Sequence, residues 1–272
     1  MPHINPTWQL AVGTAAGLLL VALLLQFAGW AKSAAAAREI TLVASLYAGW
    51  QLIGTVTQRN VDGATANAQR VWDVEQALHL PSELALQQAI LPHPWLVQLC
   101  NGYYVYGHFN PVIGLLAWIW LRHRAAYPRV RLLLGLLTAS AFVVHFVPVA
   151  PPRLMPQLGF RDVALEYGQS VYGSFGAGIP GQLLAMPSLH VGWAVLLAYV
   201  VVTTTRSRWR WLALLHPVAM TLDVAVTANH WWADGVVCAV LLALCVAAER
   251  AGSALWLRRR PVPLAALEPV QA

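Results

Sequence analysis

Two histidines and an aspartate have the types and spacing needed for nucleophilic chemistry. His230 and Asp234 are four residues apart in the segment TANHWWAD, so on a helix their side chains would meet on one face. An aspartate that accepts a hydrogen bond from Nδ1 of a histidine fixes the tautomer whose Nε2 can attack an electrophile. His190, in AMPSLH, is a candidate general acid and base for the same reaction. The alternative is a buried pair that only ties two helices together.

Two further residues are candidates for binding an anion beside these side chains. Ser188 follows Pro187 at the expected start of a helix, where unpaired backbone N–H groups attract phosphate oxygens. Its hydroxyl adds a donor, although it could instead only cap the helix. Arg153, in VAPPRLMP, can clamp the same phosphate with two parallel hydrogen bonds, or it could anchor the chain at a membrane interface. The combination predicts phosphoryl chemistry.

Tyr104 and His108 stand one turn apart in YVYGHF and are candidates for substrate binding. A core hydrogen bond between helices is the alternative role for this pair. A zinc site is the chemical rival to the histidine nucleophile, and its ligands would come from His145, His190, His230 and Asp234. The sequence has no HExxH motif, and we expect neither a metal nor another cofactor.

The elements that position these residues must be membrane helices. The chain has 272 residues, of which 58% are hydrophobic and only 10% charged, whereas soluble domains carry about 25% charged residues. Its net charge of +6 does not indicate a nucleic-acid partner, because most basic residues sit at the ends of apolar runs. The three cysteines lie in apolar segments without CxxC spacing, which favours a packing role.

The apolar runs predict an all-α polytopic transmembrane bundle of about seven helices. Their expected ranges are 8–30, 38–57, 95–121, 129–149, 188–205, 210–228 and 231–250. With the N-terminus outside and the C-terminus in the cytoplasm, 13 of the 17 basic residues fall in the cytoplasmic segments, as membrane orientation rules require. The candidate site residues then lie together on the extracytoplasmic side.

Four regions follow from this pattern. Residues 1–57 form two N-terminal helices, 58–94 an extracytoplasmic amphipathic segment broken near Pro81, 95–250 the membrane core with the chemistry, and 251–272 a cytoplasmic tail that we expect to be disordered. Within the core, the Gly- and Pro-rich stretch 149–186 is a long outer loop of the kind that often carries function.

The segments AMPSLH and TANHWWAD resemble the second and third signature motifs of the type 2 phosphatidic acid phosphatase superfamily. The resemblance covers roughly residues 100–250. It implies a metal-independent enzyme that works through a phosphohistidine intermediate, with His190, His230 and Asp234 as its catalytic residues. Membrane lipids would be the substrates of such an enzyme.

The chain departs from the phosphatase branch of that superfamily at two cationic positions. Phe146 stands where the first motif has Lys, and Val224 stands where the third motif has Arg. Together with YVYGHF and APPRL, these departures make the chain similar to the inositolphosphotransferase branch, which includes inositol-phosphorylceramide synthases and aureobasidin-resistance proteins. A phosphodiester carries less negative charge than a phosphomonoester, so fewer cationic ligands suit it. Restoring Lys and Arg at the two positions is then expected to favour monoester hydrolysis.

Three functions remain open from the sequence. The first is a lipid phosphotransferase that moves a phosphoryl or inositol-phosphate-like headgroup to a lipid or small-alcohol acceptor. The second is a phosphatase acting on phosphatidic acid or a polyprenyl phosphate, and the third is a noncatalytic lipid-phosphate binder or transporter. The composition, rich in Ala, Arg and Trp, suggests a bacterial plasma membrane protein.

Overall fold

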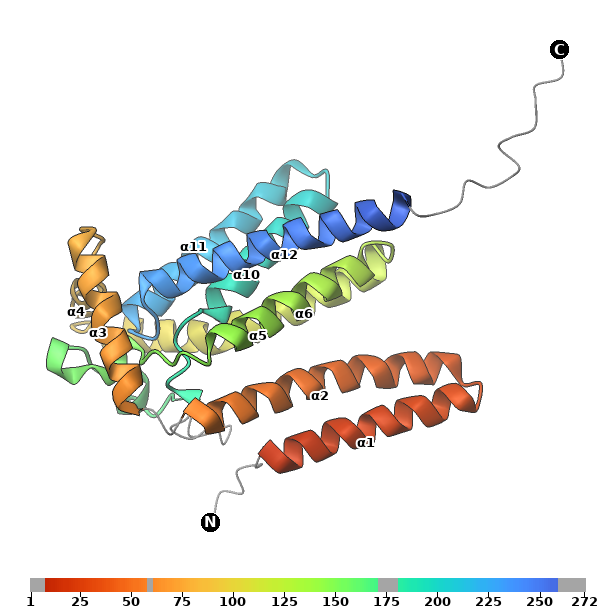
Figure 1. Ribbon diagram of the computed structural model, residues 1–272. Coiled ribbons are helices and arrows are strands. Elements are labelled where there is room, and N and C mark those ends of the chain that lie inside the picture. The colour runs from red at the N-terminus through yellow and green to blue at the C-terminus, as the bar shows by residue number, and fades with distance from the viewer. Residues whose placement is uncertain (1–7, 58–60, 171–180, 259–272) are drawn as a thin grey trace.

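The computed structural model describes residues 8–57, 61–170 and 181–258. Within these ranges the regular elements are helices, with a single isolated bridge between Val149 and Leu184 (Figure 1). The predicted all-α membrane bundle is confirmed. Part of the predicted outer loop (171–180), the start of the amphipathic segment (58–60) and most of the predicted tail (259–272) lie outside the described residues.

An N-terminal hairpin is made by α1 (Trp8–Phe27) and α2 (Ala31–Thr57). The turn between them uses Gly29 at a φ of 79°, a conformation that glycine adopts without strain. Small residues bring the two backbones together, since Ala15, Ala22 and Ala34 are buried while most leucines of α1 are exposed. The hairpin meets the rest of the molecule where α2 packs on α6.

Five helices form the main bundle: α5 (Pro94–Arg122), α6 (Tyr127–Val144), α10 (Leu189–Thr204), α11 (Leu215–Val226) and α12 (Trp232–Arg258). α10 packs against each of the other four and is the centre of the bundle. An apolar cluster that includes Leu133, Leu137 and Leu196 fills the space between α6, α10 and α12. Among the described helices, α1, α2, α6 and α12 are long and apolar enough to cross a membrane, and α10 is a shorter apolar helix.

The closest approach of α10 to α12 depends on a glycine. A Cβ atom placed on Gly192 would overlap the Sγ atom of Cys238. We therefore expect Gly192→Ala to destabilise the protein by about 1–3 kcal/mol, the usual effect of overpacking. Thermal unfolding in detergent measures this, and Gly192→Ala combined with Cys238→Ala is expected to recover much of the loss. A single Gly192→Ala variant as stable as wild type would contradict the packing.

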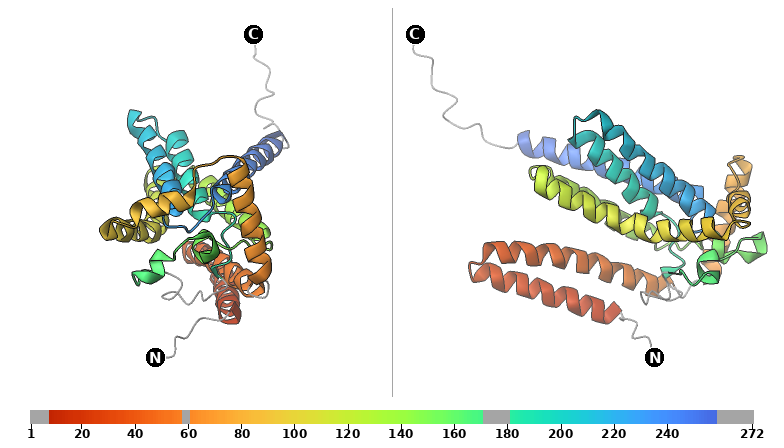
Figure 2. Two further views of the ribbon diagram at one scale, coloured as in Figure 1. Left: turned by 90° about the vertical axis from the view of Figure 1, so that its left-hand side faces the viewer. Right: turned by 180° about the vertical axis from the view of Figure 1, so that it is seen from behind.

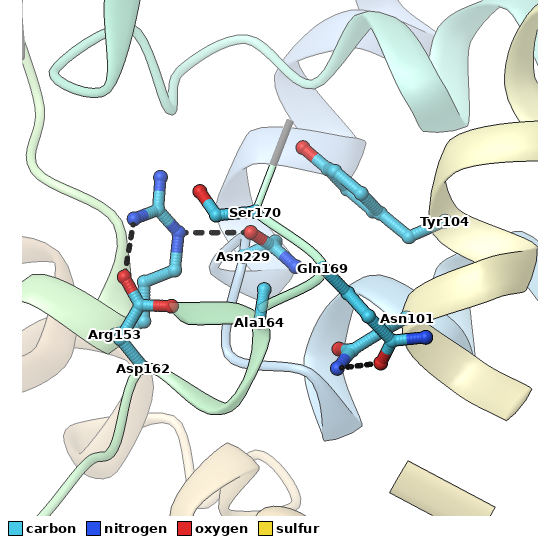
Figure 3. A pocket seen from close by; sticks show the side chains of 8 residues that line it. All are labelled: Asn101, Tyr104, Arg153, Asp162, Ala164, Gln169, Ser170 and Asn229. Carbon is cyan, nitrogen blue, oxygen red and sulfur yellow. Dashed lines mark hydrogen bonds and ion pairs between the residues drawn. The ribbon is translucent and has the colours of Figure 1, made fainter. Parts of the chain in front are cut away.

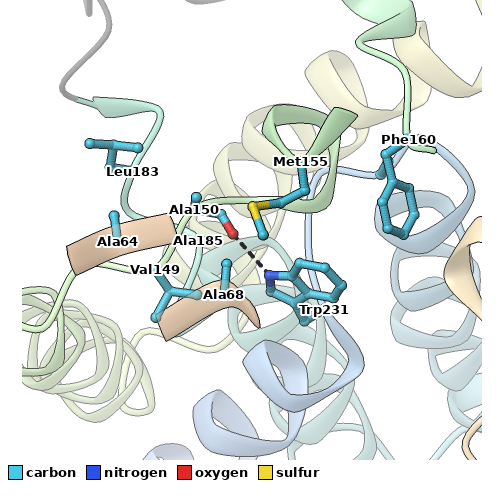
Figure 4. Packing of buried hydrophobic residues seen from close by; sticks show 10 residues of the cluster. Ala64, Ala68, Val149, Ala150, Met155, Phe160, Leu183, Ala185 and Trp231 are labelled. Carbon is cyan, nitrogen blue, oxygen red and sulfur yellow. Dashed lines mark hydrogen bonds between the residues drawn. The ribbon is translucent and has the colours of Figure 1, made fainter. Parts of the chain in front are cut away.

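Short helices cover one end of the bundle (Figures 1 and 2). They are α3 (Val61–Ala77), α4 (Glu83–Ile90), η2 (Pro152–Leu154), η3 (Pro156–Leu158) and α7 (Val163–Glu166). The predicted break near Pro81 falls between α3 and α4. Trp231 is 1% exposed and packs there against Trp72 and Phe160, and its Nε1 donates to the Ala150 carbonyl at 2.9 Å (Figure 4). This cluster fastens the covering segments to the start of α12.

Each of the seven expected helices has a counterpart, with larger boundary differences in four places. α2 begins at Ala31 instead of 38. α6 ends at Val144 instead of 149, because Pro148 lacks an N–H and disfavours helix in the residue before it. α11 begins at Leu215, after the 3-10 helix η4 (Arg208–Leu214). α12 continues to Arg258, past the expected end at 250. Just before this extension, Glu249 pairs with Arg129 of α6 at 2.8 Å.

Candidate active site

His230 and Asp234 lie in contact at the start of α12. Nδ1 of His230 is 3.1 Å from Oδ2 of Asp234 and 2.9 Å from the carbonyl oxygen of Ala185. A carbonyl oxygen and an ionised carboxylate can only accept hydrogen bonds. Nδ1 of His230 must therefore carry the proton, and Nε2 has its lone pair free. The arrangement matches the tautomer that a nucleophilic histidine needs.

The local structure that brings this pair together differs from the expected one. The sequence suggested one helix face, but α12 begins at Trp232, so His230 precedes the helix. The carboxylate of Asp234 reaches back instead, because its Oδ2 also accepts the backbone N–H of Trp231 at 3.0 Å. Asp234 is fully buried, which keeps water from competing for its hydrogen bonds.

His190 stands beside this pair at the first turn of α10. The centroids of the His190 and His230 rings are 5.6 Å apart. The His190 ring is partly exposed, and it packs on Tyr104 at 4.1 Å and on His108 at 4.0 Å between centroids. The structure therefore brings three of the sequence candidates, two of them from α5, around the imidazole of His190.

His108 is also stacked on Trp193 at 4.6 Å. Tyr104 and His108 are 6% and 7% exposed, so both side chains are buried walls of the site. Both rings contact the ring of His190, which neither the predicted substrate-binding role nor the alternative, a hydrogen bond between core helices, included.

Ser188 is buried at the N-terminus of α10 and acts there as a cap. Its Oγ accepts the backbone N–H of Val191 at 3.3 Å, which satisfies one of the unpaired N–H groups of the first turn. Its own backbone N–H donates to the carbonyl oxygen of Asp234 at 3.0 Å. Ser188 thus links the segment carrying His190 to the segment carrying Asp234, and the cap leaves its hydroxyl hydrogen unused.

Arg153 is hydrogen-bonded to the residues that immediately precede His230. Its backbone N–H donates to the carbonyl of Ala228 at 2.8 Å, and its Nε donates to Oδ1 of Asn229, the residue before His230, at 2.9 Å. Its Nη1 lies 3.0 Å from Asp162 and 3.1 Å from Oε1 of Gln182. The guanidinium is held in place before any ligand arrives, and Asp162 offsets part of its charge.

A small polar pocket opens beside Arg153 (Figure 3). Tyr104 lies across the pocket from Arg153, and on the Tyr104 side Nδ2 of Asn101 donates to Oε1 of Gln169 at 3.0 Å. Asp162 lines the pocket near Arg153, and the remaining lining residues are neutral: Ala164, Ser170 and Asn229. Arg153 is the single cation among the residues that line it, so the pocket provides neutral donors and acceptors and one guanidinium.

The two positions where the superfamily phosphatases carry cations do not line this pocket. Phe146 is 60% exposed, and Val224 is buried in an apolar cluster with Tyr104, Val191, Ala194 and Met220. An arginine at position 224 would be buried among apolar side chains, at a high cost in folding free energy. Restoring both cations is therefore not a clean test of substrate preference, because it would also change the stability of the fold.

Sequence reasoning missed Asn229 and Asp162. Asn229 precedes His230 within the TANHWWAD motif, so its position was a usable signal. Asp162 lies in the outer loop nine residues after Arg153, and no local pattern marks it. For the rival zinc site, the described residues hold no group of three or more His, Cys, Asp or Glu side chains arranged to bind a metal ion.

Comparisons with known proteins give one match. A family model described as "PAP2 superfamily" matches residues 69–248, which include all of the candidate site residues. The match is to the superfamily and does not single out the inositolphosphotransferase branch. Searches of curated proteins and of solved structures find no match.

Proposed function

Since this chain belongs to the PAP2 superfamily, and so has a lipid phosphatase or phosphotransferase type of function, we propose that it is a membrane lipid phosphotransferase with His230 as its nucleophile. The observation that carries the proposal is the hydrogen bond from Nδ1 of His230 to Asp234 at 3.1 Å, with His190 beside it. This bond leaves Nε2 unprotonated and gives the imidazolium formed after attack a buried counter-charge.

The reaction proceeds in two balanced steps. In the first, Nε2 of His230 forms a bond to phosphorus, the bond from phosphorus to the donor's oxygen breaks, and His190 delivers a proton to that oxygen. In the second, His190 takes the proton of an acceptor hydroxyl, the acceptor oxygen bonds to phosphorus, and the phosphorus–Nε2 bond breaks. Arg153 and the first-turn N–H groups of α10 stabilise the charge on the phosphoryl oxygens.

The charge of the pocket favours a phosphodiester donor and hence headgroup transfer. Arg153 is the single cation among the lining residues, and its pairing with Asp162 leaves little net positive charge for a dianionic monoester. The neutral side chains of Asn101, Gln169 and Asn229 suit a polar headgroup such as a phosphorylated polyol. The second candidate, a lipid phosphate phosphatase, uses the same histidines with water as the acceptor.

We place the site on the extracytoplasmic side of a bacterial plasma membrane. The histidines lie at the end of the bundle covered by α3 and α4, and the opposite end carries the α1–α2, α5–α6 and α10–η4 turns (Figure 2). Most of the basic residues gather at that opposite end, which the positive-inside rule assigns to the cytoplasm.

The test is a product analysis with purified protein. Phosphatidylinositol, phosphatidic acid and polyprenyl phosphates are supplied with and without a lipid alcohol acceptor, and products are followed by mass spectrometry. We expect an adduct that needs the acceptor. Free phosphate without an acceptor would establish the phosphatase instead, and binding without any consumption of lipid would show a noncatalytic binder.

Arg153 gives a second expected outcome. Lysine keeps the charge but cannot bond Asn229, Asp162 and a phosphate at once, so we expect Arg153→Lys to lower kcat/KM by about 10- to 100-fold. Arg161→Lys is the matched control, because Arg161 forms an exposed pair with Glu166 and the change is expected to alter kcat/KM by less than about twofold. Equal effects of the two substitutions on kcat/KM in steady-state kinetics would contradict a role for Arg153 in binding the phosphate.

A further inference from the structure

Two carboxyl groups outside the proposed catalytic constellation are buried beside it. Glu75 near the end of α3 is 1% exposed, and Glu83 in the first turn of α4 is fully buried. Glutamate is almost never fully buried without a partner that compensates for its lost hydration. These two side chains therefore need a physical reason for their positions.

Both carboxyl groups bind the first turn of α12. Oε1 of Glu83 accepts the backbone N–H of Trp232 at 3.1 Å, and Oε1 of Glu75 accepts that of Ala233 at 2.8 Å. The preceding N–H, that of Trp231, is held by Asp234. The first N–H groups of a helix have no partner within the helix and carry its positive dipole end, which carboxylates complement. Three successive N–H groups are thus held by carboxyls from three different helices.

This clamp lies within the segment that presents the nucleophile. Trp232 and Ala233 fall between His230 and Asp234, so fixing their backbone also fixes the spacing of the two catalytic side chains. A second bond, from Nε1 of Trp232 to the carbonyl of Pro81, holds the link between α3 and α4 against the same turn. Displacement of α3 or α4 would therefore move His230 relative to Asp234.

The second oxygen atoms of Glu75 and Glu83 indicate that the two carboxyl groups share a proton. Oε2 of Glu75 and Oε2 of Glu83 are buried, and neither meets an N–H or hydroxyl donor among the described residues. The two carboxyls are within hydrogen-bonding reach of each other. A single proton between them supplies the missing donor and leaves one negative charge facing the N-terminus of α12.

The protonation of Glu75 agrees with this arrangement. Burial, the hydrogen bond and charge of Glu83 from α4, and the charge of Asp234 from α12 together raise the pKa of Glu75 to about 9, against the lowering effect of the N–H of Ala233. An acid whose pKa is raised in the folded state holds its proton there but loses it when unfolded. Its contribution to stability is full below about pH 4.5 and is lost as the pH rises to about 9.

We propose that Glu75 and Glu83 form a carboxyl pair that positions His230 and Asp234 by holding the first turn of α12. The proposal rests on the proposed function for its effect on turnover. Loss of the shared proton places two negative charges side by side in a buried site, which drives the carboxyls apart and loosens the turn. Turnover therefore falls as the pH passes about 9.

The experiment compares two substitutions of Glu75 with one control, all in the full-length protein. Glutamine keeps an oxygen for Ala233 and offers Glu83 a permanent N–H donor, so Glu75→Gln mimics the protonated form. Leucine removes both bonds at a similar volume. The control is Gln69→Ala, which removes an exposed bond from Gln69 to Asp73 within α3 and none of the bonds to α12. Each variant is assayed for kcat and KM from pH 6 to about 10, using the lipid pair that wild type converts.

We expect Glu75→Leu to lower kcat at least tenfold with KM within about threefold, because the positioned groups act on the chemical step. Glu75→Gln is expected to keep kcat within about threefold and to lose the fall in turnover near pH 9, and Gln69→Ala is expected to change neither. A folded Glu75→Leu variant with wild-type kcat, or a Glu75→Gln variant with an unchanged alkaline fall, would overturn the proposal.

Amide hydrogen exchange separates this proposal from the proposed function. In the peptide containing Trp232 and Ala233 we expect exchange to be faster in Glu75→Leu than in wild type, and not in Glu75→Gln. This difference is independent of any substrate, so it remains measurable if wild type converts no lipid and the proposed function fails. Unchanged hydrogen exchange in Glu75→Leu would show that Glu75 does not hold the first turn of α12.

Discussion

Replacing His230 with alanine is expected to lower turnover by at least about 10,000-fold, because a covalent mechanism has no route without its nucleophile. The loss should appear in kcat. The same substitution should abolish a second signal, since incubating wild type with a donor lipid alone should leave an acid-labile phosphoryl group on position 230. Mass spectrometry of peptides kept at alkaline pH measures this adduct directly.

A matched histidine controls for general damage. His93 is exposed before α5 and makes no capping hydrogen bond through its side chain, so His93→Ala is expected to leave both turnover and the adduct unchanged. An adduct on His190 instead of His230 would exchange the roles of nucleophile and general acid. Turnover that survives His230→Ala would rule out the covalent mechanism.

The sequence predicts the bundle well where the physics is local. Long apolar runs must be helical in a membrane because every backbone polar group has to be satisfied, so α1, α2, α6 and α12 follow from hydropathy alone. The early end of α6 also has a local cause in Pro148, but hydropathy does not mark where α11 begins or where α12 ends. Near the end of α12, Glu249 pairs with Arg129, which lies on α6 and is distant in the sequence.

The chemical core of the site is also largely local. His230 and Asp234 are four residues apart, and the Ser188 cap is two residues from His190, so short motifs contain most of the geometry. The contacts that hold these motifs are different, because Glu83 and Trp232 are separated by 149 residues and Glu75 and Ala233 by 158. A single sequence carries no signal for such pairings, and the amphipathic pattern of α3 and α4 predicted only a surface element.

Replacing Asp234 with asparagine is expected to lower kcat by about 1,000- to 10,000-fold with little change in KM. An aspartate that orients a catalytic histidine has an effect of this size in serine proteases, where the amide stabilises the wrong tautomer. Here Oδ2 of Asp234 meets both the N–H of Trp231 and Nδ1 of His230, so an amide NH₂ in that position gives up the bond from Trp231 but can donate to Nδ1 of His230. That bond moves the proton to Nε2 and removes the attacking lone pair.

The combination of the two substitutions tests whether Asp234 acts through His230. If it does, Asp234→Asn should have almost no further effect on turnover in a His230→Ala background, because residues that act as one unit are not additive. Thermal unfolding of each variant in detergent checks that the buried site remains folded. Additive losses would mean that the Asp234 side chain contributes by another route, such as the bond that its Oδ2 accepts from the N–H of Trp231, and the phosphohistidine mechanism would then lack its orienting group.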